Sequence, residues 1–267
     1  MKNLKIGFIG IGNMANAIIG GVLKSGVPAE QISLYDLFPE KCESLRAKGM
    51  TVYRSAQELT AECGIIFLTV KPQNFAEVLE QIRPAASETK IFVSIAAGVS
   101  TGYIKKQLGG SYTVFRAMPN TPLLLGKGAT ALYCPLDVPE ESSRLVKSFF
   151  EACGVVRLVQ EEEINTVTSI SGSSPAYFYL FAKAMMAYAQ QEGLDPETAK
   201  ALICQTMIGS AAMLLESGQT PDELIRMVSS PGGTTLEAMN VLCSRDVEGI
   251  LCDAMKACTR RAGELEK

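Results

Sequence analysis

The chain has 267 residues, 47% of them hydrophobic and 20% charged, so it can bury a sizeable core and is long enough for two domains. Its formal net charge is −3, its calculated pI is about 5.3 and it has no basic run, so we expect neither nucleic acid nor a membrane surface as a partner. It contains no histidine, which excludes Ser-His-Asp and Cys-His catalysis and His-ligated zinc.

Cysteine usage points to a reducing compartment. The cysteines form no C-x-x-C pair and have no spacing typical of metal ligands, so we predict no metal site. Their surroundings are apolar, and we expect small, buried, reduced thiols in a cytoplasmic protein. We also expect no apolar run long enough to span a bilayer. The cysteines occupy positions 42, 63, 134, 153, 204, 243, 252 and 258.

The stretch 4–19 has the pattern of a strand, a glycine turn and a helix. Its centre, Gly10-Ile11-Gly12-Asn13-Met14-Ala15, fits the G-x-G-x-x-G/A pattern that binds dinucleotides. Gly10 permits the tight turn, Gly12 lets a pyrophosphate approach the backbone, and the small Ala15 lets helix and strand pack closely. The helix start offers unpaired N–H groups to the phosphates. An ordinary βα turn with glycines is the less favoured alternative.

A second strand at 32–36 closes this βαβ unit and ends in Asp36. An acidic residue at this position can accept hydrogen bonds from the adenosine ribose, and it repels a 2′-phosphate. No arginine stands immediately beside Asp36 to receive such a phosphate. We therefore predict that NADH works at least comparably with NADPH.

Strands and helices alternate up to about residue 162, which predicts a doubly wound α/β domain over 1–162. The run 64–70 is continuously apolar, as in a parallel strand covered on both faces. Each strand opens into small or polar residues, at the sheet edge where such folds bind ligands. Further strands are predicted at 50–53, 91–95, 113–116, 129–133 and 155–158, and helices at 39–48, after Ser55, at 72–82 and at 139–153.

Residues 163–267 contain no strand-like run and predict an all-α second domain. Several of its helices are apolar on more than one face, so we expect a second subunit to cover them and the domain to dimerise. The predicted helices span 177–192, 196–216, 221–228, 235–242 and 246–265.

The stretch 228–237 combines a Pro231-Gly232-Gly233 turn with Thr234 and Thr235 at a helix start. Backbone N–H groups there can hold a small anion such as a carboxylate, and the Thr235 hydroxyl can donate or accept a hydrogen bond. A capped turn between helices is an equally good interpretation. The stretch 171–177, by contrast, is accounted for by a helix cap followed by Pro175.

Six motifs in one order carry a family resemblance. They are GFIGIGNMA (7–15), VKPQN (70–74), SIAAGVS (94–100), RAMPNTP (116–122), SGSSPAY (171–177) and SSPGGTT (229–235). In this order the chain resembles the pyrroline-5-carboxylate reductase family over nearly its whole length. The resemblance implies a Rossmann-like N-terminal domain, an interleaved helical dimer that can form larger rings, and reduction of 1-pyrroline-5-carboxylate to L-proline by NADPH or NADH.

The resemblance also implies roles for individual residues. Thr235 would act near the imine nitrogen as the catalytic residue. The substrate would lie against Ser230, Gly232, Gly233, Thr234 and Thr235, with Glu161 close by, although Glu161 equally fits a solvated acidic run. The cofactor would lie against Ile9, Gly10, Ile11, Gly12, Asn13, Met14, Asp36, Thr69, Val70, Lys71, Pro72, Ala96, Ala97 and Asn120.

Two other functions are compatible with the same scaffold. One is another imine reductase or a β-hydroxyacid dehydrogenase, but in that pattern a lysine in the position of Lys183 is followed four residues later by Asn, and here Ala187 stands there. The other is a dinucleotide-binding regulator without turnover, against which the intact Pro-Gly-Gly-Thr-Thr turn argues.

Overall fold

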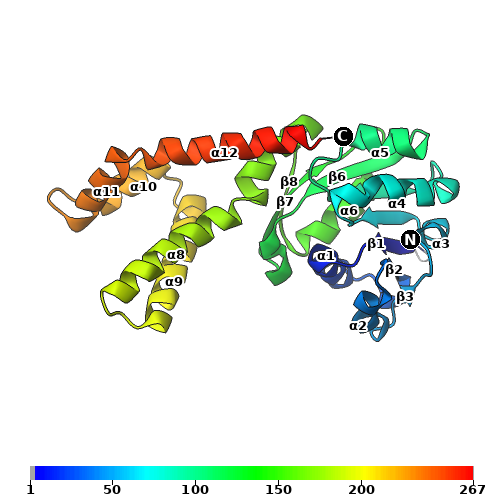
Figure 1. Ribbon diagram of the computed structural model, residues 1–267, viewed down its shortest axis with the longest axis horizontal. Coiled ribbons are helices and arrows are strands. Elements are labelled where there is room, and N and C mark those ends of the chain that lie inside the picture. The colour runs from blue at the N-terminus through cyan, green and yellow to red at the C-terminus, as the bar shows by residue number, and fades with distance from the viewer. Residues whose placement is uncertain (1–3, 267) are drawn as a thin grey trace. The chain divides into compact units, whose positions relative to one another are not determined.

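The computed structural model describes residues 4–266, which separate into two compact units (Figure 1). One unit holds the chain up to Pro175 together with the segment from Ala257 onward, and the other is Ala176–Lys256. The first contains a single sheet with helices, and the second is helical throughout. The predicted fold class, an α/β domain followed by an all-α domain, is confirmed.

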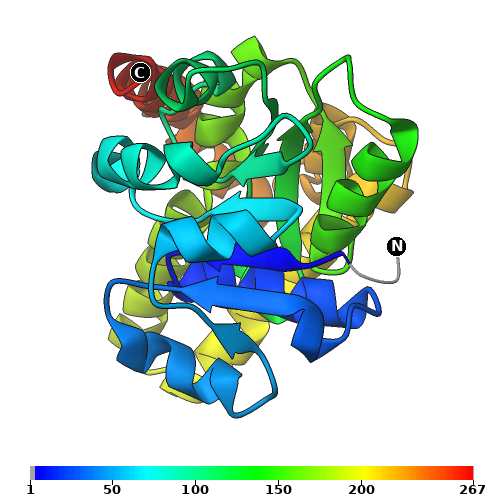
Figure 2. The same ribbon diagram turned by 90° about the vertical axis from the view of Figure 1, so that its right-hand side faces the viewer.

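The sheet of the α/β unit consists of β1 (Ile6–Ile9), β2 (Ile32–Tyr35), β3 (Thr51–Val52), β4 (Ile65–Leu68), β5 (Ile91–Ser94), β6 (Thr113–Met118), β7 (Gly128–Tyr133) and β8 (Gly154–Leu158). The strand order is β3-β2-β1-β4-β5-β6-β7-β8, visible in Figure 2, and only the β6–β7 pair is antiparallel. After β3 the chain returns to the other side of β1 and adds β4 there, so β1 lies between β2 and β4. The carboxyl end of β1 is therefore the switch point at which doubly wound sheets bind ligands.

Helices cover both faces of this sheet. Phe8 and Phe67 stack with ring centroids 4.6 Å apart on the face that also buries Phe149. Ile9 and Leu68, one residue further along the same strands, belong to the cluster on the opposite face. The first face is covered by α1 (Asn13–Lys24) and α6 (Glu140–Glu151), the second by α3 (Ala56–Glu62), α4 (Phe75–Ile82) and α5 (Thr101–Leu108), while the short α2 (Glu43–Arg46) follows β2.

Two helices of the α/β unit differ from the sequence prediction. The predicted helix 39–48 is a 3₁₀ turn, Pro39–Cys42, followed by the single turn of α2. Helix α5 was not predicted at all, because Gly102, Lys105 and Lys106 leave it only weakly apolar. The helix begins after Ser100, whose hydroxyl accepts a hydrogen bond from the Tyr103 N–H as an N-cap.

The boundary between the units lies elsewhere than the sequence suggested. The helix α7 (Ile164–Val167) and the π-helical turn Thr168–Gly172 contact β6 and β7, so they belong to the α/β unit although they follow residue 162. The last helix, α12 (Val247–Glu264), begins in the helical unit and ends in the α/β unit. A single cut along the sequence therefore cannot describe the two units.

The helical unit exposes large apolar side chains in a single copy of the chain. Leu180 and Leu215 are 65% and 84% exposed. By length and composition alone α9 (Pro196–Glu216) could cross a membrane, so the expectation that no run is long enough was wrong for this helix. The other helices of this unit are α8 (Pro175–Gln191), α10 (Pro221–Val228) and α11 (Thr234–Ser244).

All eight cysteines are free thiols. Cys42, Cys63 and Cys153 are buried as expected, and burial raises the pKa of each of these thiols. Three cysteines of the helical unit, Cys204, Cys243 and Cys252, are exposed in the single chain, so the expectation of burial was wrong for them.

Two adjacent glycines of α1 test the packing of that helix. A Cβ at Gly21 would lie 2.3 Å from Cys153 Sγ and 2.4 Å from the Phe149 carbonyl oxygen, whereas a Cβ at Gly20 would meet nothing within 4 Å. We expect Gly21→Ala to lower the free energy of unfolding by about 1–3 kcal/mol, and Gly20→Ala to raise it by about 0.4–1 kcal/mol. Urea denaturation measures both, and equal effects would contradict the close approach of α1 to α6.

Candidate functional site

The glycine turn between β1 and α1 uses its two glycines differently. Gly10 has φ +97°, and a Cβ there would lie 2.9 Å from the Val70 backbone nitrogen, so the backbone itself requires glycine. Gly12 has an ordinary φ of −101°, and a Cβ there would meet nothing within 4 Å. Internal packing therefore explains Gly10 but leaves Gly12 free to admit something from outside the chain.

The start of α1 is open to an anion. Gly12 is the N-cap residue, and no side chain accepts a hydrogen bond from the first turn. That turn itself also contains no acidic residue that could take the place of a bound anion. Backbone N–H groups at such a helix start suit a pyrophosphate.

The neighbouring strands hold the turn in place. Thr69, just after β4, donates its backbone N–H to the Ile9 carbonyl at 3.0 Å. Its hydroxyl lies 2.6 Å from the Gly10 carbonyl oxygen and 2.9 Å from that of Ile9. On the other side, the Ile11 N–H donates to Asp36 Oδ2 at 2.6 Å. The structure thus brings Ile9, Gly10, Ile11, Asp36 and Thr69 together.

Asp36 is more fully engaged than the sequence suggested. Besides Ile11, its carboxylate accepts the Phe38 N–H at 2.9 Å and pairs with Lys41 Nζ at 3.2 Å. The Asp36 side chain is 8% exposed, whereas that of Lys41 is 46% exposed. Sequence reasoning missed Lys41, because only the turn after β2 brings it back to the strand end. Its ammonium group offsets the charge that would repel a 2′-phosphate.

The loops after β4 and β5 open at the same sheet edge as the glycine turn, because β1, β4 and β5 are parallel neighbours. Lys71 is exposed at the start of a 3₁₀ turn that begins with Pro72. Ala96 is buried and its N–H donates to Ser94 Oγ at 3.3 Å, while Ala97 is half-buried. These loops supply small side chains and exposed backbone, which suit the close approach of a flat ring.

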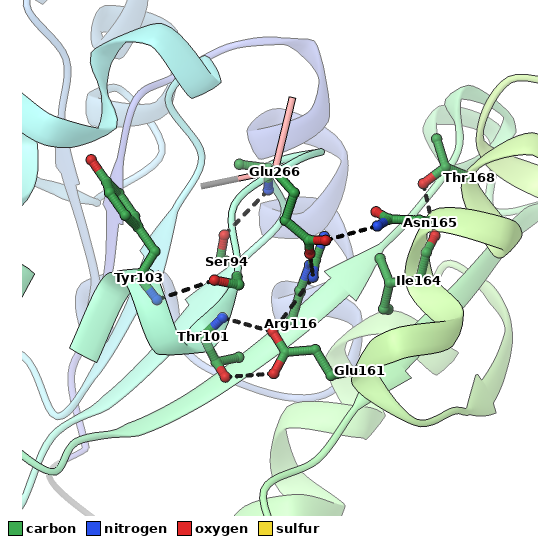
Figure 3. A network of polar contacts seen from close by, with 11 residues as sticks. Ser94, Thr101, Tyr103, Arg116, Glu161, Ile164, Asn165, Thr168 and Glu266 are labelled. Atoms are coloured by element: carbon green, nitrogen blue, oxygen red, sulfur yellow. Dashed lines mark hydrogen bonds and ion pairs between the residues drawn. The ribbon is translucent and has the colours of Figure 1, made fainter. Parts of the chain in front are cut away.

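Asn120 and Glu161 have partners within the chain. The Asn120 side-chain amide donates to the Ser171 carbonyl at 3.0 Å and accepts the Ala129 N–H at 2.9 Å. The Glu161 carboxylate accepts the Thr101 N–H at 2.7 Å and the Thr101 hydroxyl at 2.6 Å (Figure 3). These contacts account for both side chains without a ligand, so their roles toward cofactor and substrate stay predictions.

A second uncapped helix start lies in the helical unit. Gly232 has φ +69°, which favours glycine, and the Gly233 N–H closes the turn onto the Ser230 carbonyl at 2.9 Å. Gly233 is the N-cap of α11, and no side chain caps the helix. Among the hydrogen bonds of residues 4–266, none engages the Thr235 hydroxyl, and the side chain is half-buried. This helix start can therefore accept a carboxylate together with a donor or acceptor on the same ligand.

Two family models match the chain. Residues 5–98 match the family described as NADP oxidoreductase, coenzyme F420-dependent, and residues 161–265 match the family described as pyrroline-5-carboxylate reductase dimerisation. The first match contains the glycine turn, the loop after β4 and the first part of the loop after β5. The second contains the π-helical turn, the helical unit and the Gly233–Thr235 helix start.

Known proteins resemble the chain over its full length. The pyrroline-5-carboxylate reductase of Escherichia coli K12 is 39% identical over 98% of both chains, and pyrroline-5-carboxylate reductase 2 of Bacillus subtilis is 35% identical over 98% of this chain and 95% of its own length. Among solved structures, a pyrroline-5-carboxylate reductase from Coxiella burnetii has a TM-score of 0.90 at 35% identity, covering 99% of each chain. The Plasmodium falciparum pyrroline carboxylate reductase with NADP bound has a TM-score of 0.91 at 29% identity, covering 100% of each chain.

The two glycines of the turn should respond differently to alanine. Gly12→Ala is expected to weaken dinucleotide binding by about tenfold or more while changing the free energy of unfolding by no more than about 1 kcal/mol. Gly10→Ala should instead destabilise the fold by about 1–3 kcal/mol, because it strains the backbone. Fluorescence titration with NADPH and urea denaturation separate the two effects. Unchanged dinucleotide affinity in Gly12→Ala would remove the open helix start from the binding site.

The pair Asp36–Lys41 predicts a shift in cofactor preference. Lys41→Ala removes the cation beside Asp36, so kcat/KM with NADPH should fall by about three- to tenfold and kcat/KM with NADH by less than about twofold. Lys48→Ala, on an exposed lysine of the same segment, is the control. Steady-state kinetics at matched cofactor concentrations measure the ratio, and equal losses with both cofactors would contradict the role of Lys41.

Proposed function

The chain belongs to the pyrroline-5-carboxylate reductase family, and we propose that it reduces 1-pyrroline-5-carboxylate to L-proline with NADPH or NADH. The observation that carries this proposal is the pair of uncapped helix starts, α1 at Gly12 and α11 at Gly233. A dinucleotide and an amino-acid-like imine each carry an anionic group that needs such a site. The full-length relatives support the same substrate class.

The cofactor is held by the α/β unit. The N–H groups at the start of α1 would bind the pyrophosphate, and Asp36 with Lys41 would face the adenosine ribose. Val70, Lys71 and Pro72 after β4 and Ala96 and Ala97 after β5 would hold the nicotinamide ribose and ring. When bound, the nicotinamide supplies the hydride that reduces the C=N bond. Asp36 favours NADH and Lys41 offsets that preference, so both cofactors support turnover.

The substrate is held by the helical unit. The N–H groups of Gly233, Thr234 and Thr235 bind the carboxylate, and Ser230 and Gly232 shape the turn that presents them. The Thr235 hydroxyl lies near the imine nitrogen and orients its N–H. A cyclic imine is basic enough to be bound as the iminium, so the chain needs no strong acid, in keeping with its lack of histidine. Catalysis then rests on positioning rather than proton transfer.

Self-association completes the helical unit. Its large exposed apolar side chains, on α8 and α9 among others, need a partner, and the matched dimerisation model covers these helices. We infer an interleaved homodimer that can assemble into a ring of dimers, in the cytoplasm. A dimer interface also accounts for the apolar composition of α9 and for the exposed thiols of Cys204, Cys243 and Cys252.

The activity is tested by following NAD(P)H oxidation at 340 nm with 1-pyrroline-5-carboxylate, and in the reverse direction with 3-hydroxy acids. Oxidation of NAD(P)H with the imine is expected, and no turnover on it would overturn the proposal. Turnover on a 3-hydroxy acid alone would point to a β-hydroxyacid dehydrogenase. Cofactor binding without turnover on either would point to a regulator.

Thr235 provides the residue-level test. Thr235→Ala removes the hydroxyl and should lower kcat/KM for the imine by roughly tenfold to a thousandfold, or about 1.4–4 kcal/mol. Thr235→Ser keeps the hydroxyl and should retain most of the activity. NADPH affinity, measured by fluorescence, should stay the same in both variants. Wild-type kcat/KM in Thr235→Ala would exclude the hydroxyl from the mechanism.

A further inference from the structure

A buried cation lies on β6. The Arg116 side chain is 1% exposed, and its Nη1 lies 2.8 Å from Glu266 Oε1 and 3.5 Å from Glu161 Oε1. Its Nε and Nη2 have no partner among the described residues. A buried guanidinium is costly unless it is paired, so the two carboxylates are needed to hold it there (Figure 3).

Glu266, which directly follows α12 and Leu265, is anchored from two sides. Its Oε1 pairs with Arg116, and its Oε2 accepts a hydrogen bond from Asn165 Nδ2 at 2.9 Å. Burial acts to raise the pKa of Glu266, but the hydrogen bonds from Arg116 and Asn165 outweigh it and hold the pKa below its ordinary value. The carboxylate is therefore charged at neutral pH, and the segment Leu265–Glu266 is fixed to the α/β unit.

Leu265 lies directly on the loop between β5 and α5. Gly98 in this loop has φ +69°, and a Cβ there would lie 2.9 Å from both the Cβ and the carbonyl oxygen of Leu265. At the far end of the loop, Thr101 is bound twice by Glu161, which itself faces Arg116. The loop that contains Ala96 and Ala97 is thus confined on both sides by groups that depend on Arg116.

We propose that Leu265 and Glu266 are positioning residues that hold the β5–α5 loop, residues 95–100, in the shape required to orient the nicotinamide. The inference rests on the proposed function, which places this loop beside the nicotinamide. Neither residue needs to touch the cofactor: Glu266 fixes the chain end through Arg116 and Asn165, and Leu265 then covers Gly98. A loosened loop would leave the phosphates bound at α1 but misalign the reacting ring.

The test compares two glutamates at the end of the chain. Glu266→Ala removes the anchor, whereas Glu264→Ala removes a carboxylate whose ion pairs within residues 4–266 are to the exposed Arg260 and Arg261 of its own helix. In Glu266→Ala, kcat should fall by about five- to fiftyfold while KM for NADPH changes by less than about threefold. The primary isotope effect with NADPH deuterated at C4 should rise, because hydride transfer becomes slower. Glu264→Ala should match the wild type, and Glu266→Gln, which keeps an acceptor for Arg116, should be intermediate.

Hydrogen exchange of the cofactor-free protein gives a readout that does not need activity. Amides of residues 96–100 should exchange at least about tenfold faster in Glu266→Ala than in Glu264→Ala, with exchange in β1 and β4 unchanged. Equal exchange at these amides, or an unchanged kcat, would overturn the inference. If the wild type does not reduce the imine, the proposed function fails, while exchange still tests the anchored loop. Should Glu266→Ala not fold, Asn165→Ala loosens Glu266 and leaves Arg116 paired.

Discussion

A positive charge on the central part of the sheet has to be neutralised inside the protein, and much of the surrounding structure follows from this constraint. Arg116 pairs with Glu161 from the turn after β8 and with Glu266 from the segment that follows α12. Glu161 in turn fixes Thr101 at the start of α5. Segments that are far apart in the sequence therefore meet at one guanidinium, and the loop after β5 takes its shape from them.

In the proposed function each of the two units binds one anionic group, the cofactor's pyrophosphate or the substrate's carboxylate. Each presents a helix start without a side-chain cap, α1 after Gly12 and α11 after Gly233, and leaves backbone N–H groups available. Under this proposal the pyrophosphate and the substrate carboxylate both lie against backbone donors, so neither of these two groups requires a cationic side chain. This agrees with a chain that has a net charge of −3 and no histidine, and whose reaction requires alignment more than proton transfer.

Local patterns predicted the fold and the glycine turn well, because both are encoded by neighbouring residues. The continuous apolar run at 64–70 became β4, and Gly10 and Gly12 lie in the turn between β1 and α1. What the sequence could not predict depends on residues distant along the chain or on weak local signals. Contacts between distant residues account for Lys41 beside Asp36, the two carboxylates on Arg116 and the return of α12 to the α/β unit. A weak local signal accounts for the polar helix α5.

The open space beside Gly12 also bears on how variation at this turn would be detected. A screen that scores only the cellular abundance of variants registers Gly10, where the backbone is strained, and Gly21, where a neighbouring helix would clash. Such a screen would not detect a substitution at Gly12, because an added side chain there meets no other part of the chain and the stability of the fold changes little. Some substitutions would leave the abundance of the protein unchanged but prevent growth without external proline. The positions of these substitutions would outline the cofactor-binding surface of this protein without any ligand-bound structure.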